Sequence, residues 1–271
     1  MKLVVASTKD TASVNIAQQI LSHHDFEELD EVFHKKPIYS KKIQDREVKL
    51  IFIKEEPIHA QYITEFFQPE LIIFASRHSS TSGTPTLSVH TPGNLTETTL
   101  GGKPRKVSTS PASAMKEALL KMAKMKEEMK LDYQVSYEAT HHGPSLDTPT
   151  MFVELGSSPK QWKDLRAAEA VAHAAMAAVS KRSRYSAVLG IGGPHYNLKF
   201  TRMALDTQRA FGHMIPKYAI PQMDGEMIRQ CVERTVEKVE SAVLDWKGVR
   251  GADKGMLMTV LSQLGLSTEK T

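Results

Sequence analysis

Short apolar segments alternate with longer amphipathic stretches along the chain, and this alternation restricts the possible folds more than any other feature. Segments typical of strands lie at Lys2–Ala6, Val48–Ile53, Leu71–Ala75, Gln134–Glu138, Met151–Leu155, Ala187–Ile191 and Ala242–Asp245. Several stretches between them repeat apolar residues at helical spacing. Strands that alternate with helices predict an α/β fold, in which a mostly parallel sheet is flanked by helices on both faces.

Several helix starts are marked by capping residues. The dipeptide Ser110-Pro111 predicts a helix capped by the serine, with the proline at its first position. Ser158-Pro159 gives the same signal before an alanine-rich helix at Trp162–Val179. Asp10 and Asp224 each precede an amphipathic stretch, and we expect both to cap helices.

Size and composition point to one globular domain. The length suits a single α/β domain, expected over residues 1–271. The formal charge of +4 permits a polyanionic partner without demanding one. The single cysteine, Cys231, predicts a buried thiol and a reducing, cytoplasmic location. Because no apolar run approaches the ~18 residues that span a bilayer, we expect no membrane association.

Residues 76–110 interrupt this alternation with a polar stretch rich in Ser, Thr, Gly and Pro, and we expect a long active-site loop there. At its start, Arg77-His78-Ser79-Ser80 follows a strand, and ligands of α/β sheets gather beyond the carboxyl ends of strands. Further on, His90 precedes the turn Thr91–Asn94, whose backbone N–H groups can face an anion. The alternative for either histidine is a loop residue hydrogen-bonded to the backbone.

The segment Tyr137–Pro144, Tyr-Glu-Ala-Thr-His-His-Gly-Pro, is the strongest local signal for chemistry. Adjacent side chains of a strand alternate, but on a loop His141 and His142 can diverge to reach two partners, or a metal and a substrate. Glu138 and His142 are close enough in sequence to form an acid–base or ligand pair. The segment lacks the HExxH spacing of helical zinc sites. A polar turn stabilised by its own histidines is the structural alternative.

Other loops add glycines and cations. Gly190–Tyr196 follows a strand, and its glycines allow close approach of a ligand, but it matches neither a dinucleotide fingerprint nor a Walker loop. His213 and Lys217 share one loop, and Lys247 and Arg250 follow the last strand, beside a tryptophan. Lysine and arginine beside an aromatic ring suit phosphate and base contacts, although solvated loop cations are the common alternative.

In this order, the loops resemble the D-aminoacyl-tRNA deacylase family of the archaeal and plant type. The matching segments are Ala75–Ser80, His90 with Gly93-Asn94, Pro111–Lys116, Tyr137–Pro144, Phe152–Ser158, Gly190–Tyr196, Ala210–Ala219 and Asp245–Gly251. The stretch Thr81–Ser88 departs from the family pattern. The resemblance implies a fold similar to purine nucleoside phosphorylases and peptidyl-tRNA hydrolases.

The resemblance also implies hydrolysis of the ester that joins a D-amino acid to the tRNA 3′ end, with zinc as cofactor. The expected partner is aminoacyl-tRNA rather than DNA, and we expect a monomer. The residues expected to be catalytic are Glu138, His141 and His142. The expected zinc ligands are His90, His141, His142 and His195. The residues expected to bind substrate are Arg77, His78, Ser79, Ser80, Asn94, Lys116, Gly192, Gly193, Tyr196, His213, Lys217, Lys247 and Arg250.

Three alternatives stay open. A metal-free mechanism would use one histidine as base, with Lys217 or Arg77 stabilising charge. A nucleoside phosphorylase or nucleosidase would release a free base from a nucleoside. A tRNA-binding protein without catalysis is the third, but six histidines in loops argue against it, because RNA binding relies more on Lys, Arg and aromatic side chains.

Overall fold

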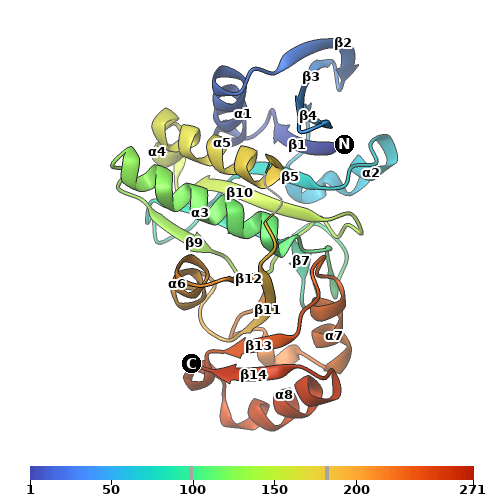
Figure 1. Ribbon diagram of the computed structural model, residues 1–271, viewed down its shortest axis with the longest axis vertical. Helices are drawn as coiled ribbons and strands as arrows, with labels where there is room; N and C mark the ends of the chain where they lie inside the picture. Colours follow the sequence, from blue (N-terminus) through green and yellow to red (C-terminus); the bar gives the residue numbers. More distant parts are fainter. Residues whose placement is uncertain (98–99, 181–182) are drawn as a thin grey trace.

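The computed structural model describes residues 1–97, 100–180 and 183–271. Its two main sheets lie toward opposite ends of an elongated molecule (Figure 1). One cluster of buried apolar side chains includes Val89 of the first sheet and Phe211 of the second, so the two sheets share a core. The α/β architecture with mostly parallel strands is confirmed.

The first sheet has eight strands in the order β2-β3-β4-β1-β5-β10-β6-β9. Their bounds are β1 Lys2–Ser7, β2 Glu27–Phe33, β3 Lys36–Ile43, β4 Arg46–Ile53, β5 Ile72–Arg77, β6 Thr86–His90, β9 Gln134–Tyr137 and β10 Thr150–Gly156. The central strands β4, β1, β5 and β10 are parallel, whereas β6 runs antiparallel to β10 and parallel to β9. The carboxyl ends of β6 and β9 therefore lie together, whereas β5 and β10 run in the opposite direction.

The second sheet has four parallel strands in the order β12-β11-β13-β14. Their bounds are β11 Ser186–Ile191, β12 Arg209–Ile215, β13 Ser241–Leu244 and β14 Ser267–Lys270. A small antiparallel ribbon, β7 Gly93–Asn94 with β8 Lys106–Val107, lies in the connection that follows β6.

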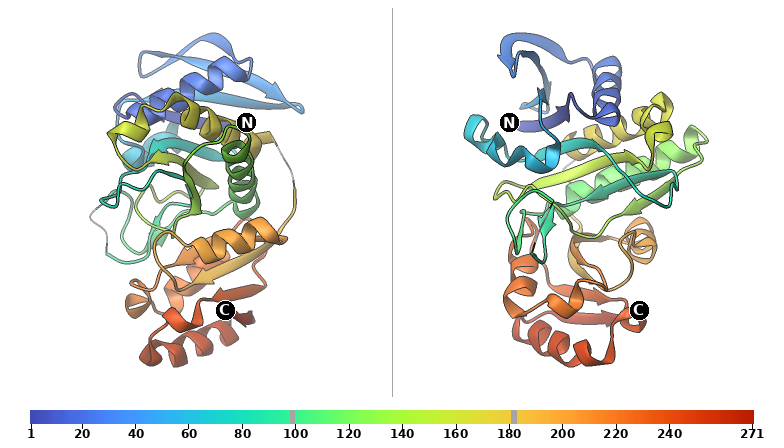
Figure 2. Two further views of the ribbon diagram at one scale, coloured as in Figure 1. Left: turned by 90° about the vertical axis from the view of Figure 1, so that its left-hand side faces the viewer. Right: turned by 180° about the vertical axis from the view of Figure 1, so that it is seen from behind.

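Helices cover the sheets because their apolar stripes face the strands. The helices of the first part are α1 Thr11–His23, α2 Ile63–Phe66, α3 Ala112–Glu128, α4 Pro159–Trp162 and α5 Leu165–Ser180, with the 3-10 turn η1 Pro57–Tyr62. Those of the second are α6 Leu198–Asp206, α7 Gly225–Glu233 and α8 Gly251–Gln263, with the 3-10 turns η2 Ile220–Gln222 and η3 Trp246–Gly248. The hairpin of β2 and β3 and the helix α8 mark the two ends of the molecule (Figure 2).

Alternate residues of β1 reach two different cores. Val4 and Ala6 pack with α1 and α5 on one face of the sheet, while Leu3 and Val5 pack with η1 and α2 on the other. Both faces are therefore covered, which explains why the strand reads as a continuous apolar run rather than an alternating one.

The expectation of one long loop over residues 76–110 is wrong in its middle, because Thr86–His90 forms β6 inside the first sheet. This strand is fully buried, and two of its five residues are Thr and Ser, whose hydroxyls hide the apolar pattern. The remainder of the segment connects β5, β6 and the β7–β8 ribbon.

Some of the predicted helix caps are confirmed and one is wrong. Asp10 and Asp224 cap α1 and α7, accepting hydrogen bonds from Ser13 N at 3.0 Å and Met227 N at 2.9 Å. Ser110 does not cap α3, because Pro111 occupies the N-cap position. The carboxylate of Glu237 accepts from the first backbone N–H groups of α3 instead.

The alanine-rich helix is also interrupted. Ser158 caps the short helix α4, and the chain then breaks before α5. Asp164 Oδ1 accepts hydrogen bonds from Arg166 N at 3.0 Å and Ala167 N at 3.1 Å, which starts α5 as a separate helix.

Two further expectations concern the single cysteine and membrane-spanning helices. Cys231 is buried, and burial raises the pKa of its thiol to about 12, so the side chain serves as a small apolar core group. None of the helices in the described part of the chain combines the length and the apolar character needed to cross a bilayer.

Candidate active site

Imidazole and carboxylate side chains from five segments converge where the two sheets meet. His78 follows β5, His90 ends β6, Glu154 lies in β10, the Glu138 loop follows β9, and β11 is followed by the loop of His195. We call the following residues the histidine cluster: His78, His90, Glu138, His141, His142, Glu154, His195 and Tyr196.

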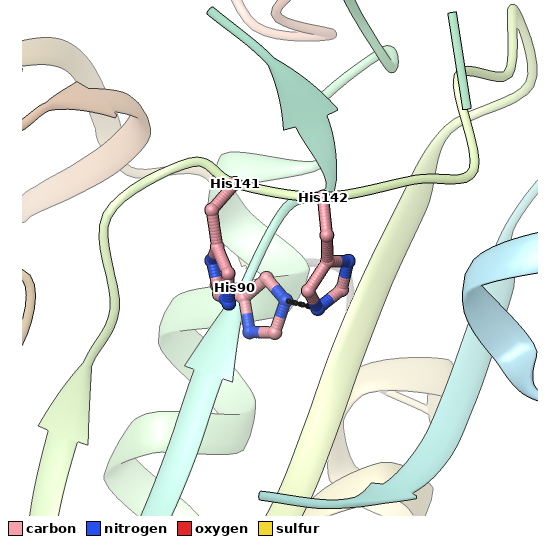
Figure 3. Close-up of side chains that lie close together, drawn as sticks. All are labelled: His90, His141 and His142. Carbon is pink, nitrogen blue, oxygen red and sulfur yellow. Dashed lines mark hydrogen bonds between the residues drawn. The ribbon is translucent and has the colours of Figure 1, made fainter. Parts of the chain in front are cut away.

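Three imidazoles of the cluster gather around one point (Figure 3). His90 Nε2 lies 3.3 Å from His142 Nε2, and the rings of His90 and His141 have centroids 4.4 Å apart. His141 Nδ1 and His142 Nδ1 each face a backbone carbonyl, of Ala139 at 2.8 Å and of Gly143 at 2.6 Å. With Nδ1 donating to those carbonyls, Nε2 of both rings holds the lone pair.

His141 and His142 point the same way, although a loop would also allow them to diverge (Figure 3). His142 has a φ of 43°, in the left-handed region, so the backbone turns between the two residues and returns the second ring to the side of the first. Gly93 N donates to the carbonyl of His142 at 2.6 Å and fixes this turn. The next residue, Gly143, packs so closely that a Cβ there would lie 2.2 Å from Gly102 N.

Burial sets the protonation of this group. His90 is fully buried and His141 is partly buried, and both have pKa values well below the usual value, first because of this burial and next because His142 lies beside them. Burial lowers the pKa of His142 to about 4. All three rings are therefore neutral near pH 7 and keep lone pairs for ligation or proton acceptance.

Glu138 lies at the centre of the cluster and is fully buried. Its Oε2 lies 3.0 Å from His195 Nε2 and 3.6 Å from His141 Nε2, and its Oε1 lies 3.4 Å from His78 Nδ1. Burial alone would raise the pKa of this carboxyl, but the hydrogen bond from His195 and the neighbouring imidazoles hold it well below the usual value. Glu138 is therefore a carboxylate that orients the rings around it.

His78 lies between two buried carboxylates. Its Nδ1 is 3.4 Å from Glu138 Oε1 and 3.5 Å from Glu154 Oε2, and its Nε2 is 2.5 Å from the hydroxyl of Tyr196. Burial opposes protonation of His78, but the hydrogen bond to Glu154 and the two negative charges raise its pKa. Burial and the charge of Glu138 raise the pKa of Glu154 to about 7, so this pair shares a proton near neutral pH.

Two cavities open onto the cluster, and His141, His142 and Leu100 line both. The larger, about 380 Å³, also contains Arg77, His78, Ser79, Glu154, His195 and Tyr196 in its lining. The smaller, about 240 Å³, is lined on its other side by Asn94, Leu95, Tyr218 and Gln222, among others. Asn94 Nδ2 donates to the carbonyls of Gly101 and Lys103 and shapes this wall.

Two residues expected to bind substrate lie behind the cluster instead. His213 is fully buried, with Nδ1 3.1 Å from Thr140 Oγ1 and Nε2 3.1 Å from the carbonyl of Ser108. It therefore helps to hold the loop of Glu138 in place. Lys116 is buried in α3, where its Nζ donates to the carbonyls of Thr207 and Arg209. It therefore ties α3 to the start of β12.

Gly192 and Gly193 shape the loop that carries His195. Gly192 N donates to the carbonyl of Ile215 at 2.8 Å, so this N–H is engaged rather than facing a substrate oxygen. Gly193 has a φ of 74°, and a Cβ there would lie 2.4 Å from Asn197 Nδ2. The glycines thus allow the sharp exit from β11.

The remaining expected residues lie on the surface near the loops. Ser80 Oγ lies 3.0 Å from Ser82 Oγ in an exposed turn beyond the larger cavity. Lys217 and Lys247 are exposed after β12 and β13, respectively. Arg250 is also exposed and pairs with Asp253 at 2.8 Å.

Glu154 was not expected, although the sequence carries a signal for it. It is the one acidic residue in the otherwise apolar strand β10. A carboxylate in a buried strand requires a cationic or hydrogen-bonding partner, and such residues are rarely structural alone.

Comparison with known proteins identifies the family. The family model described as D-aminoacyl-tRNA deacylase matches residues 65–269, which include the whole histidine cluster. The chain belongs to the D-aminoacyl-tRNA deacylase family. The resemblance of the loops is thereby confirmed.

Curated members of the D-aminoacyl-tRNA deacylase family match along almost the whole chain. The D-aminoacyl-tRNA deacylase of Pyrococcus furiosus is 38% identical over 98% of both chains. That of Methanosarcina barkeri is 32% identical over 98% of this chain and 88% of its own. The crystal structure of a conserved protein of unknown function superposes with a TM-score of 0.89 at 33% identity, covering 100% of this chain and 95% of the other.

Proposed function

We propose that this protein hydrolyses the ester between a D-amino acid and the 3′ end of tRNA, releasing the free amino acid and reusable tRNA. The observation that carries the proposal is the Glu138–His195 pair, buried on one side and open to the larger cavity on the other. A carboxylate that orients an imidazole beside a cavity is the arrangement that ester hydrolases use to activate a nucleophile. Membership of the deacylase family supports the choice of ester.

We further propose that His90, His141 and His142 hold a zinc ion. Their ring nitrogens lie within 4.8 Å of one another, and His90 Nδ1 has no hydrogen-bond partner among the described residues. The carbonyls behind His141 and His142 fix the rings in the way that outer contacts fix metal-binding imidazoles. When bound, zinc would supply a Lewis acid that polarises the ester carbonyl. His195, the fourth expected ligand, has its Nε2 3.0 Å from Glu138 Oε2, and we assign it to proton transfer instead.

In this proposal His195 is the general base. Its Nε2 is held by Glu138 Oε2 at 3.0 Å, and its Nδ1 lies 3.2 Å from the hydroxyl of Tyr218, at the mouth of the site. Nδ1 removes a proton from the attacking water as its oxygen bonds to the ester carbon. Glu138 stabilises the imidazolium that forms.

The leaving ribose oxygen needs a proton when its bond to the carbonyl carbon breaks. The hydroxyl of Tyr196 supplies it, and His78 Nε2, 2.5 Å away, replaces the proton on Tyr196. The two carboxylates beside His78 keep this ring protonated, because they raise its pKa. His195 and His78 thus act as base and acid at opposite sides of Glu138.

The two cavities offer separate places for the parts of the substrate. The terminal adenosine occupies the larger cavity, where Arg77 and Tyr196 present planar groups to a base. The D-amino acid side chain enters the smaller cavity, whose wall includes the backbone of Gly93 and Asn94. Contacts from backbone atoms of the cavity wall would distinguish the D from the L configuration at the α-carbon while accepting many different side chains.

Exposed lysines near the loop ends suit the tRNA backbone. Lys217 and Lys247 remain exposed, whereas Arg105 and Lys106 pair with Asp224 and Asp147. We therefore assign phosphate contacts to the two exposed lysines. We also propose that the protein acts as a monomer, since the histidine cluster comes from one chain, and that it works in the cytoplasm, where its tRNA substrate would be found.

The proposal is tested by incubating the purified protein with matched D- and L-aminoacyl-tRNA and measuring the ester that remains. Loss of the D-ester alone is expected. Equal loss of both, or loss of neither, would contradict the proposal. A parallel incubation of nucleosides with phosphate tests the phosphorylase alternative, for which release of a free base would be the supporting result.

A further inference from the structure

A second group of imidazoles lies on the helical layer, away from the histidine cluster. His23 is in the last turn of α1, and Glu169 and His173 are one turn apart on α5. We propose that His23, Glu169 and His173 bind a second transition-metal ion of the zinc type, independent of the active site.

The position of His23 separates this site from catalysis. The helix α1 starts just beyond the carboxyl end of β1, next to Asp10, whose carboxylate accepts a hydrogen bond from Arg77 N at 2.7 Å. The helix has 13 residues, so its last turn lies about 18 Å farther along the helix axis, at 1.5 Å per residue. The metal site therefore lies toward the opposite edge of the first sheet.

The three potential ligand atoms face one another. Glu169 Oε1 lies 4.0 Å from His23 Nε2 and 3.8 Å from His173 Nε2, and all three atoms lie within 4.8 Å of one another. These separations exceed those of good hydrogen bonds. Ligands bound to tetrahedral zinc at about 2.0–2.1 Å lie roughly 3.4 Å apart, so the two distances to Glu169 Oε1 need to shorten by about half an ångström.

Contacts behind His173 fix the ring for ligation. His173 Nδ1 lies 3.1 Å from His24 Nε2, so a proton on Nδ1 donated to His24 leaves the lone pair on His173 Nε2. That nitrogen is the one that faces Glu169 and His23. Outer contacts of this kind orient metal-bound imidazoles in proteins.

The helices supply the three ligands from two rigid elements. Glu169 and His173 are at i and i+4, so they lie on one face of α5, and α1 packs against that helix. A Glu–His pair on one helix surface is common and does not by itself indicate a metal site. A third ligand from another helix gives the number of protein ligands found in open zinc sites. The side chains of His23, Glu169 and His173 are 40%, 27% and 20% exposed, so a fourth position is open to water.

A hollow of about 680 Å³ borders the site, and its lining includes His173, Lys41 and Lys121. The lysines reduce the attraction for a cation, while the single carboxylate of Glu169 opposes them. Binding weaker than that of a closed structural site is therefore expected. The bound ion would link α1 to α5 and stabilise the amino-terminal layer.

The test measures zinc binding by the full-length protein after chelation and dialysis, using calorimetric titration with zinc alone. The wild type is expected to bind one equivalent more than His23→Gln and Glu169→Gln, each of which removes one ligand at a solvent-accessible position. His59→Gln, an exposed histidine elsewhere, should keep the wild-type count. The same number of equivalents in the wild type and in both ligand variants would overturn the proposal.

Two further readouts distinguish this site from the active site. Excess zinc should raise the melting temperature of the wild type more than that of either ligand variant, since ligands that bind only the native state stabilise it. The deacylation rates of both variants should stay within twofold of the wild type. A loss of zinc stoichiometry that comes with a tenfold loss of rate would place the ion in the catalytic cluster and contradict an independent site.

Discussion

Glu138 Oε2 lies 3.0 Å from His195 Nε2, and 57 residues separate them along the chain. The contact joins the loop after β9 in the first sheet to the loop after β11 in the second. Backbone contacts reinforce it, because Ala139 N donates to the carbonyl of His195 at 2.8 Å. The site is thus built across both sheets, and its geometry depends on how the sheets pack.

Removal of zinc should abolish most of the activity. Without a bound ion, the neutral imidazoles of His90, His141 and His142 lie close together, and the buried His90 Nδ1 has no hydrogen-bond partner among the described residues. After chelation we expect the D-aminoacyl-tRNA hydrolysis rate to fall at least about tenfold, and readdition of zinc to restore it. A protein that is free of zinc by elemental analysis but fully active would support the metal-free mechanism.

The substitution Tyr196→Phe should lower kcat with little change in KM, because it removes the hydroxyl that delivers the proton to ribose. A general acid contributes about 10²-fold or more, so a fall of about that size is expected. Tyr133→Phe serves as the control, since the Tyr133 hydroxyl contacts Asp164 outside the cluster. Steady-state kinetics of both variants provide the measurement, and an unchanged kcat for Tyr196→Phe would exclude the relay.

Stability should fall in acid partly through His213. The folded protein keeps this ring neutral down to a pKa of about 4, whereas the unfolded chain protonates it near 6.5. Between these values the unfolded state binds more protons, so the contribution is complete above about pH 6.5 and is lost progressively as the pH falls toward 4. This amounts to about 3 kcal/mol.

The variant His213→Gln isolates that contribution. Glutamine does not titrate, so the free energy of unfolding should fall less steeply between pH 6.5 and 4 than in the wild type. Urea denaturation at a series of pH values gives both slopes. Parallel curves for the two proteins would contradict a neutral, buried His213.

Two glycines should respond in opposite directions to the same substitution. At Gly143 a new Cβ would lie 2.2 Å from Gly102 N and 2.6 Å from the carbonyl oxygen of Ile58, so Gly143→Ala should destabilise the protein by about 2–3 kcal/mol. At Gly255, inside α8, nothing lies within 4 Å, and alanine should stabilise by about 0.5–1 kcal/mol. Thermal unfolding of both variants checks the prediction, and equal shifts would contradict the packing at Gly143.

The sequence predicts the sheet better than it predicts the site. Buried strands such as β1 and β10 are apolar on both faces, so their positions can be read locally. The sequence does not predict the strand Thr86–His90, because its hydroxyl residues are typical of a loop and only the neighbouring strands bury it. The order of the strands in the sheets determines which loops lie close together, and the local sequence pattern of each strand does not reveal that order.

Within the site, residue type was predictable, but role was not. The histidines near strand ends do converge, whereas His213, which was expected in a loop, lies inside β12 and faces inward to Thr140. Lys116 resembles a helix-surface cation, yet the register of α3 against β12 buries it. Glu154 becomes significant only when His78, 76 residues earlier, lies beside it.

In the proposed mechanism the Glu138 carboxylate orients His195 for hydrolysis of D-aminoacyl-tRNA. The single-turnover rate of ester cleavage by Glu138→Gln tests it most directly, with Glu117→Gln as a matched buried carboxylate in α3. We predict a rate about 10³-fold below wild type for Glu138→Gln, because the imidazole loses its charged partner, and a near-normal rate for Glu117→Gln. A folded Glu138→Gln protein with a rate close to that of the wild type would contradict the account.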